Sequence, residues 1–298
     1  MEKIIVDDRY YIIRELGHGG YATVFLANDS VTSSLVAIKV VECNDGDAKR
    51  LAMFKQEAMT MAAISSSNVA KVYGNGIYDN NPYLVMEYVH GHSLKDIIKE
   101  NGYLLVDEVY AYLKQIIDGL EMIHALNIVH RDIKSNNIIK KSDGSIVLID
   151  FGTAFIYDSD INLYHEDGKT IIGTVQYMAP ELKDNPQGTV QTDIYALGIT
   201  IFEMFTGKYP FNHQNKIEVL KMHIYNAFPS VRKINPNVPV EFEKIIYKCC
   251  EKNPNNRYRN VNELRIDLIN AFNAYKNPET IVKKRKGLFR RRTWKDLY

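Results

Sequence analysis

The sequence predicts an α+β protein of two lobes, in which a small antiparallel β-sheet with one helix precedes a larger, mainly helical lobe. Strand patterns predominate in residues 10–89, and helix patterns predominate in residues 90–275. A polar loop with carboxylate and amide side chains lies early in the helical part. We therefore expect a lead-in (residues 1–9), the two lobes, and a basic C-terminal tail (residues 276–298).

Composition is that of an ordinary globular chain. The 298 residues are 46% hydrophobic and 24% charged, which is enough for two lobes. The apolar runs fall far short of the roughly 20 residues that span a bilayer, and the N-terminus lacks a signal-peptide pattern. We therefore expect a cytoplasmic location. Three cysteines (Cys43, Cys249 and Cys250) are too few for a disulfide framework, so we expect buried thiols.

The net charge of +1 is unevenly distributed. Residues 283–298 hold eight basic residues and one acidic residue, so this segment carries +7 and residues 1–282 carry −6. A mildly acidic body argues against specific nucleic-acid binding. The tail interleaves Leu288, Phe289 and Trp294 with its basic residues. We hypothesise a weak, salt-sensitive contact with an anionic membrane surface; a pseudosubstrate role and a merely disordered tail are the alternatives.

The first two predicted strands, residues 10–15 and 22–27, flank a glycine-rich turn. Glycine lets backbone N–H groups approach phosphate oxygens, so Gly17, Gly19 and Gly20 are candidate phosphate-binding residues. A tight turn without a ligand is the alternative. A strand follows this turn, which excludes the dinucleotide-binding fingerprint, because that motif needs a helix there.

The next predicted strand, residues 35–41, is apolar except for Lys39. A buried ammonium group is costly unless it is paired or bound to a ligand. We expect Glu57 to be its partner, because Glu57 lies on a predicted helix (residues 47–64) with an apolar face. A lysine that reaches solvent and a surface glutamate are the alternative.

Two further strands, residues 69–78 and 82–89, complete the predicted sheet. A connector follows at residues 90–92, and we expect its two histidines, His90 and His92, to be solvated. Apolar periodicity then predicts helices at residues 94–100, 107–126, 192–206, 215–226, 240–251 and 261–275. A β-hairpin is predicted at residues 138–149, with Asp143-Gly144 at its turn.

Three polar side chains surround this hairpin. Asp132 and Asn137 lie in the loop before it, and Asp150 follows it directly. Phosphoryl transfer needs one carboxylate for the hydroxyl proton, and an amide plus a second carboxylate for metal ions on the phosphates. A polar loop between helix and strand explains any one of these residues but not the ordered set. The sequence therefore predicts a kinase.

Over residues 10–274 the chain resembles the eukaryotic-like (Hanks-type) protein kinase family. The motifs occur in the family's order: Val36-Ala37-Ile38-Lys39, Glu57, His130-Arg131-Asp132 with Lys134 and Asn137, Asp150-Phe151-Gly152, Ala179-Pro180-Glu181, Asp193–Gly198, and Asn253-Pro254 with Arg257. The stretches Gly173–Tyr177 and Leu84–Tyr88 are most similar to catalytic domains of Firmicute PASTA-domain kinases, which usually continue into a membrane span.

The resemblance implies a bilobal protein-kinase fold that transfers phosphate from ATP, with Mg²⁺ or Mn²⁺, to serine or threonine on protein substrates. Asp132 would be the catalytic base, Lys134 would neutralise the γ-phosphate, and Asn137 and Asp150 would hold the metal. The implied ATP site consists of Gly17, Gly19, Gly20, Val24, Ala37, Lys39, Glu57, Met86, Glu87, Val89 and Ile139.

We further predict that phosphorylation of Thr170, in trans between associating copies, supplies an acidic partner for Arg131 and orders the segment that contains Thr170, and that Thr174 contacts the polar loop. The resemblance also implies structural residues. Glu181 with Arg257 would form a structural ion pair, and Asp193 would anchor a helix. The chain departs from the family at Ala22, where a third glycine is expected, and at Ser135, where proline is common.

The main alternative to a protein kinase is a pseudokinase that acts as a nucleotide-binding scaffold. A second alternative is a small-molecule phosphotransferase. Degenerate members usually lose the lysine, a metal ligand or the base. This chain keeps Lys39, Glu57, Asp132, Asn137 and Asp150, which favours an active protein kinase.

Overall fold

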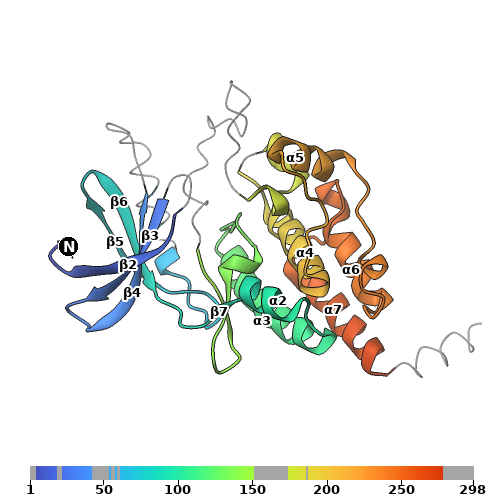
Figure 1. Ribbon diagram of the computed structural model, residues 1–298, viewed down its shortest axis with the longest axis horizontal. Coiled ribbons are helices and arrows are strands. Elements are labelled where there is room, and N and C mark those ends of the chain that lie inside the picture. Colours follow the sequence, from blue (N-terminus) through green and yellow to red (C-terminus); the bar gives the residue numbers. More distant parts are fainter. Residues whose placement is uncertain are drawn as a thin grey trace, which may run out of the picture.

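The computed structural model describes residues 5–18, 22–41, 54, 58, 61–150, 174–185 and 187–277. In these ranges the chain forms a β-sheet lobe and a larger helical lobe, which confirms the predicted fold class (Figure 1). No helix in the described ranges is long and apolar enough to cross a membrane.

The first lobe is a six-stranded antiparallel sheet with strand order β1-β2-β3-β4-β6-β5. Its strands are β1 (Ile5–Val6), β2 (Tyr10–His18), β3 (Ala22–Asp29), β4 (Ser34–Val41), β5 (Val72–Tyr78) and β6 (Asn81–Glu87). Strand β1 was not predicted, because we expected residues 1–9 to be a lead-in without regular structure. Ile5 and Val6 pair with Tyr11 and Tyr10, and Val6 is buried.

Both faces of the central strands are buried, which explains their continuous apolar runs. Val36, Ile38 and Val85 pack on one face, whereas Ala37 and Leu84 pack on the other. Because side chains alternate along a strand, Lys39 lies on the same face as Ala37. The alternation thus decides the side of the sheet toward which the single buried ammonium of β4 points.

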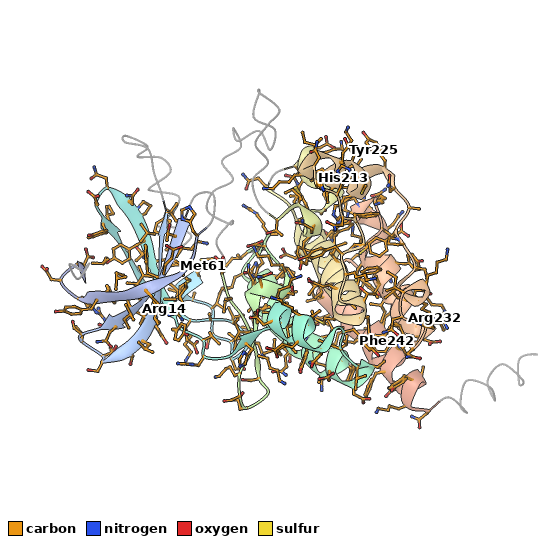
Figure 2. The ribbon with its side chains drawn as sticks, viewed as in Figure 1. Arg14, Met61, His213, Tyr225, Arg232 and Phe242 are labelled. Carbon is orange, nitrogen blue, oxygen red and sulfur yellow. The ribbon has the colours of Figure 1, made fainter. Side chains whose placement is uncertain are left out.

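Three side chains from the predicted helix at residues 47–64 support this second face. Phe54, Ala58 and Met61 are buried in the same cluster as Leu84, as the apolar face predicts. Figure 2 shows Met61 on the side of the sheet lobe that faces the helical lobe. Glu57 lies outside the described residues, so its predicted pairing with Lys39 stays a prediction.

The connector between the lobes is partly a strand. His90 and His92 are exposed, as predicted, but His92 and Ser93 form the short strand β7 (His92–Ser93) beside β8 (Ile138–Lys140). A Cβ added at Gly91 would lie 2.3 Å from the Lys140 carbonyl oxygen. The close approach of two backbones therefore requires glycine at position 91.

The predicted hairpin forms from β8 and β9 (Ile146–Leu148), and Gly144 at its turn has a φ of 85°. Strand β5 starts three residues later than predicted. The reason is that Val69 bridges to Leu148, and the Ala70 N–H donates to the Leu148 carbonyl at 2.9 Å. These two residues therefore join the sheet lobe to β9 instead of extending β5.

The helical lobe contains α2 (Leu94–Asn101), α3 (Val106–Ala125), α4 (Val190–Thr206), α5 (Lys216–Tyr225), α6 (Val240–Cys249) and α7 (Val261–Lys276), which match the predicted helices to within two residues. Short 3₁₀ turns accompany them at η1 (Ser135–Asn137), η2 (Val175–Tyr177), η3 (Pro180–Lys183), η4 (Val231–Lys233) and η5 (Pro254–Asn256).

Helix α4 is the centre of this lobe, since every residue from Thr192 to Thr206 is buried. It packs against α3 on one side and α6 on the other (Figure 1). Cys249 and Cys250 are buried free thiols beside this helix, as predicted, and Cys43 lies outside the described residues.

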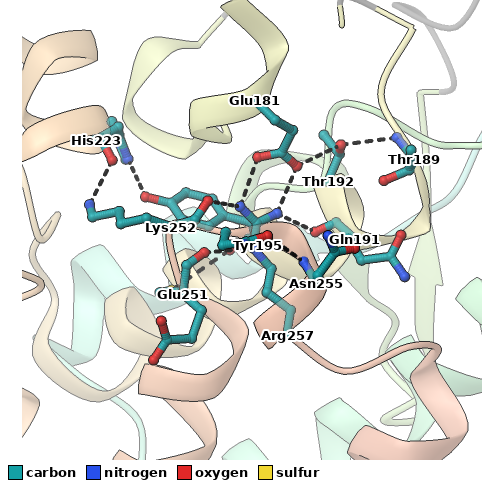
Figure 3. Close-up of polar contacts among 12 residues, drawn as sticks. Glu181, Thr189, Gln191, Thr192, Tyr195, His223, Glu251, Lys252, Asn255 and Arg257 are labelled. Atoms are coloured by element: carbon teal, nitrogen blue, oxygen red, sulfur yellow. Dashed lines mark hydrogen bonds and ion pairs between the residues drawn. The ribbon is translucent and has the colours of Figure 1, made fainter. Parts of the chain in front are cut away.

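The implied ion pair between Glu181 and Arg257 is present. The two Nη atoms of Arg257 lie 2.7 Å from the two carboxylate oxygens of Glu181 (Figure 3). Arg257 also donates to the carbonyl groups of Glu251 at 2.7 Å and Gln191 at 2.8 Å. The buried guanidinium thus connects η3, the start of α4 and the end of α6, and its charge is balanced by one carboxylate.

We expect Glu181→Ala to lower the free energy of unfolding by about 3 kcal/mol, because it leaves the buried Arg257 charge without its carboxylate. Urea unfolding measures this change. The control is Glu218→Ala, which removes an exposed pair with Lys221 and should leave the midpoint unchanged. Equal effects of the two substitutions would contradict the structural role of the buried pair.

Candidate active site

The polar loop, residues 128–137, is held by one buried carboxylate on helix α4. The backbone N–H groups of His130 and Arg131 donate to the two oxygens of Asp193, each at 2.8 Å. His124, at the end of α3, places its Nε2 2.9 Å from the same carboxylate. Burial raises the pKa of Asp193, but the contacts with His124 and His130 outweigh it and lower the pKa below its ordinary value. Asp193 therefore anchors the polar loop to α4, where the resemblance implied only an anchor for a helix.

This anchor holds Arg131 at a φ of 65°, a left-handed value that is uncommon for a side chain with a Cβ. Such backbone conformations are kept where surrounding contacts fix them. The Arg131 guanidinium donates to Gln187 Oε1 at 3.1 Å. The next residue is Asp132, so the strained position sets where that carboxylate lies.

Asp132, Lys134 and Asn137 meet at one carboxylate oxygen. Lys134 Nζ lies 2.7 Å from Asp132 Oδ2, and Asn137 Nδ2 lies 2.8 Å from the same atom. Asn137 Nδ2 also donates to the Asp132 carbonyl at 2.9 Å. Three residues that the sequence assigns to one chemical step are thus in direct contact.

Lys134 extends this group to the segment after residue 173. Its Nζ lies 3.2 Å from Thr174 Oγ1 while it keeps the contact with Asp132. The predicted contact of Thr174 with the polar loop is therefore present. Thr170 lies outside the described residues.

Asp132 has a raised pKa. Burial raises it first, the neighbouring charge of Asp150 raises it further, and Lys134 partly offsets both. A carboxylate with a raised pKa is a stronger base, and it binds a proton more readily than an exposed aspartate.

Asp150 and Lys39 form an ion pair between the lobes. Burial raises the pKa of Asp150, but Lys39 outweighs it and lowers the pKa below its ordinary value, so this carboxylate stays ionised. Asp150 also has a φ of 61°, the second left-handed backbone among the site residues. The buried ammonium predicts an acidic partner, and the structure supplies Asp150, which is 111 residues away in the sequence.

The predicted nucleotide-binding residues of the sheet lobe lie at matching register positions. Gly17, Val24 and Lys39 are opposite one another on β2, β3 and β4, and Ala37 is opposite Met86 on β6. Residues that are directly opposite in a sheet share a face, so one face carries this set.

The remaining nucleotide candidates lie near the lobe junction or outside the described residues. Glu87 ends β6, two residues earlier than predicted, and Val89 lies between β6 and the connector. Ile139 belongs to β8 of the helical lobe. Gly19 and Gly20 lie outside the described residues.

The site offers oxygen atoms to a cation. Asn137 uses its amide nitrogen to contact Asp132, so its amide oxygen is the atom that can bind a metal, together with the ionised Asp150. Carboxylate and amide oxygens suit Mg²⁺ or Mn²⁺, which take only one or two protein ligands at phosphate sites. In the described ranges no three His, Cys, Asp or Glu residues gather as a metal cluster.

The known proteins to which this chain is similar belong to one class. A family model described as the protein kinase domain matches residues 10–266. The chain is 36% identical over 266 residues to a probable serine/threonine-protein kinase PknB of Lactococcus lactis, covering 89% of this chain and 42% of that protein. It is also 36% identical over 272 residues to the serine/threonine-protein kinase PrkC of Bacillus subtilis, covering 90% and 41%. The chain thus spans less than half the length of these relatives.

We expect two substitutions to move the pKa of Asp132 in opposite directions. Lys134→Met removes the positive charge that lowers this pKa, so the pKa rises; Asp150→Asn removes the negative charge that raises it, so the pKa falls. Titration of aspartate 13Cγ signals by NMR measures both changes. Asp143, in the exposed hairpin turn, is the internal reference and should not move. Shifts of Asp132 in the same direction would contradict this account.

Proposed function

The chain belongs to the protein kinase family, and we propose that it transfers the γ-phosphate of ATP to serine or threonine hydroxyl groups of proteins. The observation that carries this proposal is the contact of Lys134 and Asn137 with one oxygen of Asp132, beside the ionised Asp150. Phosphoryl transfer uses this set of groups: a carboxylate that acts as base, a lysine ammonium beside it, and carboxylate and amide oxygens that bind metal.

In the proposed reaction Asp132 orients the acceptor hydroxyl and takes its proton. Lys134 and Asn137 fix the carboxylate through Oδ2, so it needs no reorientation when the acceptor arrives. Lys134 bridges Asp132 to Thr174, so residues 174–178 begin beside the proposed base. The acceptor must bring its hydroxyl to Asp132 and would therefore pass close to these residues. Lys39 lies on the sheet face that carries Gly17 and Val24, where it would bind the phosphates of ATP.

Asn137 and Asp150 would hold Mg²⁺ or Mn²⁺, which would neutralise the charge of the phosphates when bound. The lowered pKa of Asp150 supports this role, because a metal ligand must be ionised. The raised pKa of Asp132 supports the separate role of proton acceptor. The two carboxylates are thus suited to different tasks.

Two partner interactions belong to the same proposal. Association of two copies would allow autophosphorylation in trans, and the tail at residues 276–298 would contact an anionic membrane surface from the cytoplasmic side. The interleaved basic and aromatic residues of the tail support the membrane contact. Residues 278–298 lie outside the described residues, so this contact rests on their sequence.

We expect Asp132→Asn, Asp150→Asn and Lys39→Met each to lower phosphate transfer by on the order of 100-fold or more while the fold persists, because catalysis depends on charge at a preformed site. Incubation with labelled ATP and Mg²⁺ or Mn²⁺, followed by mass spectrometry, measures transfer, and thermal unfolding checks the fold. Asp143→Asn makes the same change in an exposed turn and should keep full activity.

Turnover retained by Asp150→Asn would contradict the metal assignment. A wild-type chain that binds ATP but transfers no phosphate would instead support the pseudokinase alternative.

We expect the active protein to carry phosphate on Thr170, because a phosphate there could pair with Arg131, the residue before the catalytic base, and order the segment. Phosphopeptide mapping of active protein identifies the site, and Thr170→Ala should lower activity at least about tenfold. Thr293→Ala, in the tail, is the matched control. Full activity of Thr170→Ala would contradict this prediction.

A further inference from the structure

A buried chain of hydrogen bonds starts at Ser135, the position where the sequence departs from the common proline. Ser135 is fully buried, and its Oγ lies 3.1 Å from Tyr177 Oη. Tyr177 also contacts Oε2 of Glu203, a fully buried residue of α4. Glu203 Oε1 lies 2.7 Å from Lys95 Nζ on α2. These hydrogen bonds therefore link the polar loop, η2, α4 and α2.

The direction of these hydrogen bonds follows from their chemistry. The carboxylate of Glu203 can only accept, so the single hydroxyl hydrogen of Tyr177 is donated to it. Burial and the neighbouring Glu203 charge raise the pKa of Tyr177, which keeps the phenol protonated. Tyr177 Oη must then accept from Ser135, so the serine hydroxyl is the donor. Proline at position 135 could not make this bond.

The backbone at this position would nevertheless accept proline. Lys134 has φ −160° and ψ 160°, the extended conformation preferred before proline, and Ser135 is the first residue of the 3₁₀ turn η1. The local geometry thus suits either residue. The distinguishing property of serine here is its hydroxyl, so Ser135→Pro removes the hydrogen bond while keeping the turn.

The hydrogen bond lies next to a second link between the same two segments. Lys134 contacts Thr174, and the adjacent Ser135 contacts Tyr177 three residues further along. The polar loop therefore contacts residues 174–178 through two consecutive residues: Lys134 at the candidate site and Ser135 in the buried core. Ser135 can influence where residues 174–178 lie without touching Asp132 itself.

We propose that Ser135 is a positioning residue for the protein acceptor: its hydroxyl holds Tyr177, and with it residues 174–178, against the polar loop beside Asp132. This role rests on the proposed kinase function. None of the residues predicted to bind adenine or the phosphates lies in η1, and Asn137 of η1 keeps its own contacts with Asp132, so we expect loss of this hydrogen bond to change acceptor binding more than ATP binding. Loss of the hydroxyl should therefore weaken acceptor binding selectively.

The test compares Ser135→Ala and Ser135→Pro with the wild-type chain, using dephosphorylated casein as the acceptor. Both variants should raise KM for casein about threefold to tenfold, the value of one hydrogen bond, while KM for ATP stays within about twofold. Hydrogen exchange should become faster at the amides of residues 174–178 and stay unchanged in α6 and α7. Adding Ser135→Ala to Tyr177→Phe should have no further effect, because both act through one bond.

Ser230→Ala is the control for lost stability. Its hydroxyl donates to Glu243 of α6 at 2.6 Å and takes no part in the bond between Ser135 and Tyr177, so this variant should lower Tm without changing KM for casein. An unchanged casein KM and unchanged exchange in Ser135→Pro would overturn the proposal, as would an equal rise in both KM values. A wild-type chain that transfers no phosphate would overturn the proposed function and the acceptor role with it, whereas the exchange data would still report on the hydrogen bond.

Discussion

The carboxylate of Asp193 accepts two consecutive backbone N–H groups of the polar loop, and the positions of the site residues follow from those two hydrogen bonds. Without Asp193, the N–H groups of His130 and Arg131 would lose their acceptor, and the left-handed backbone of Arg131 would lose its support. Asp193 itself lies in the first turn of α4 and contacts His124 at the end of α3. The loop is thereby fixed to the two helices that form the centre of its lobe.

Each of the two aspartates of the site contacts a different lysine, and their pKa values move in opposite directions. Lys39 pairs with Asp150 and lowers its pKa, whereas Asp132 keeps a raised pKa despite its contact with Lys134. Neighbouring carboxylates whose pKa values move apart are suited to different tasks, one as a base and one as a permanent charge. The lowered pKa of Asp150 depends on its ion pair with Lys39, which joins the two lobes. Because the charge of Asp150 also raises the pKa of Asp132, the relative position of the lobes affects that pKa.

Helix α4, the most buried of the described helices, carries several buried polar contacts. Asp193 accepts hydrogen bonds from the polar loop, and Glu203 accepts from Tyr177 and Lys95. The Gln191 carbonyl accepts from Arg257. Buried charges are tolerated only when each has its partners in place. Segments that are far apart in the sequence are therefore held at fixed positions around one helix, and the acceptor side of the proposed site is among them.

The sequence by itself determined the two lobes, the helices of the second lobe to within two residues and the Asp143-Gly144 turn, because periodicity and turn chemistry are local properties. Motif order likewise singled out the candidate site residues, whose roles stay predictions. The tertiary structure alone decided which partners meet: Asp150 for Lys39, Tyr177 for Ser135, and Leu148 for Val69. A sequence pattern shows that a buried charge or hydroxyl needs a partner. It does not say which distant residue the folded backbone will bring within hydrogen-bonding distance.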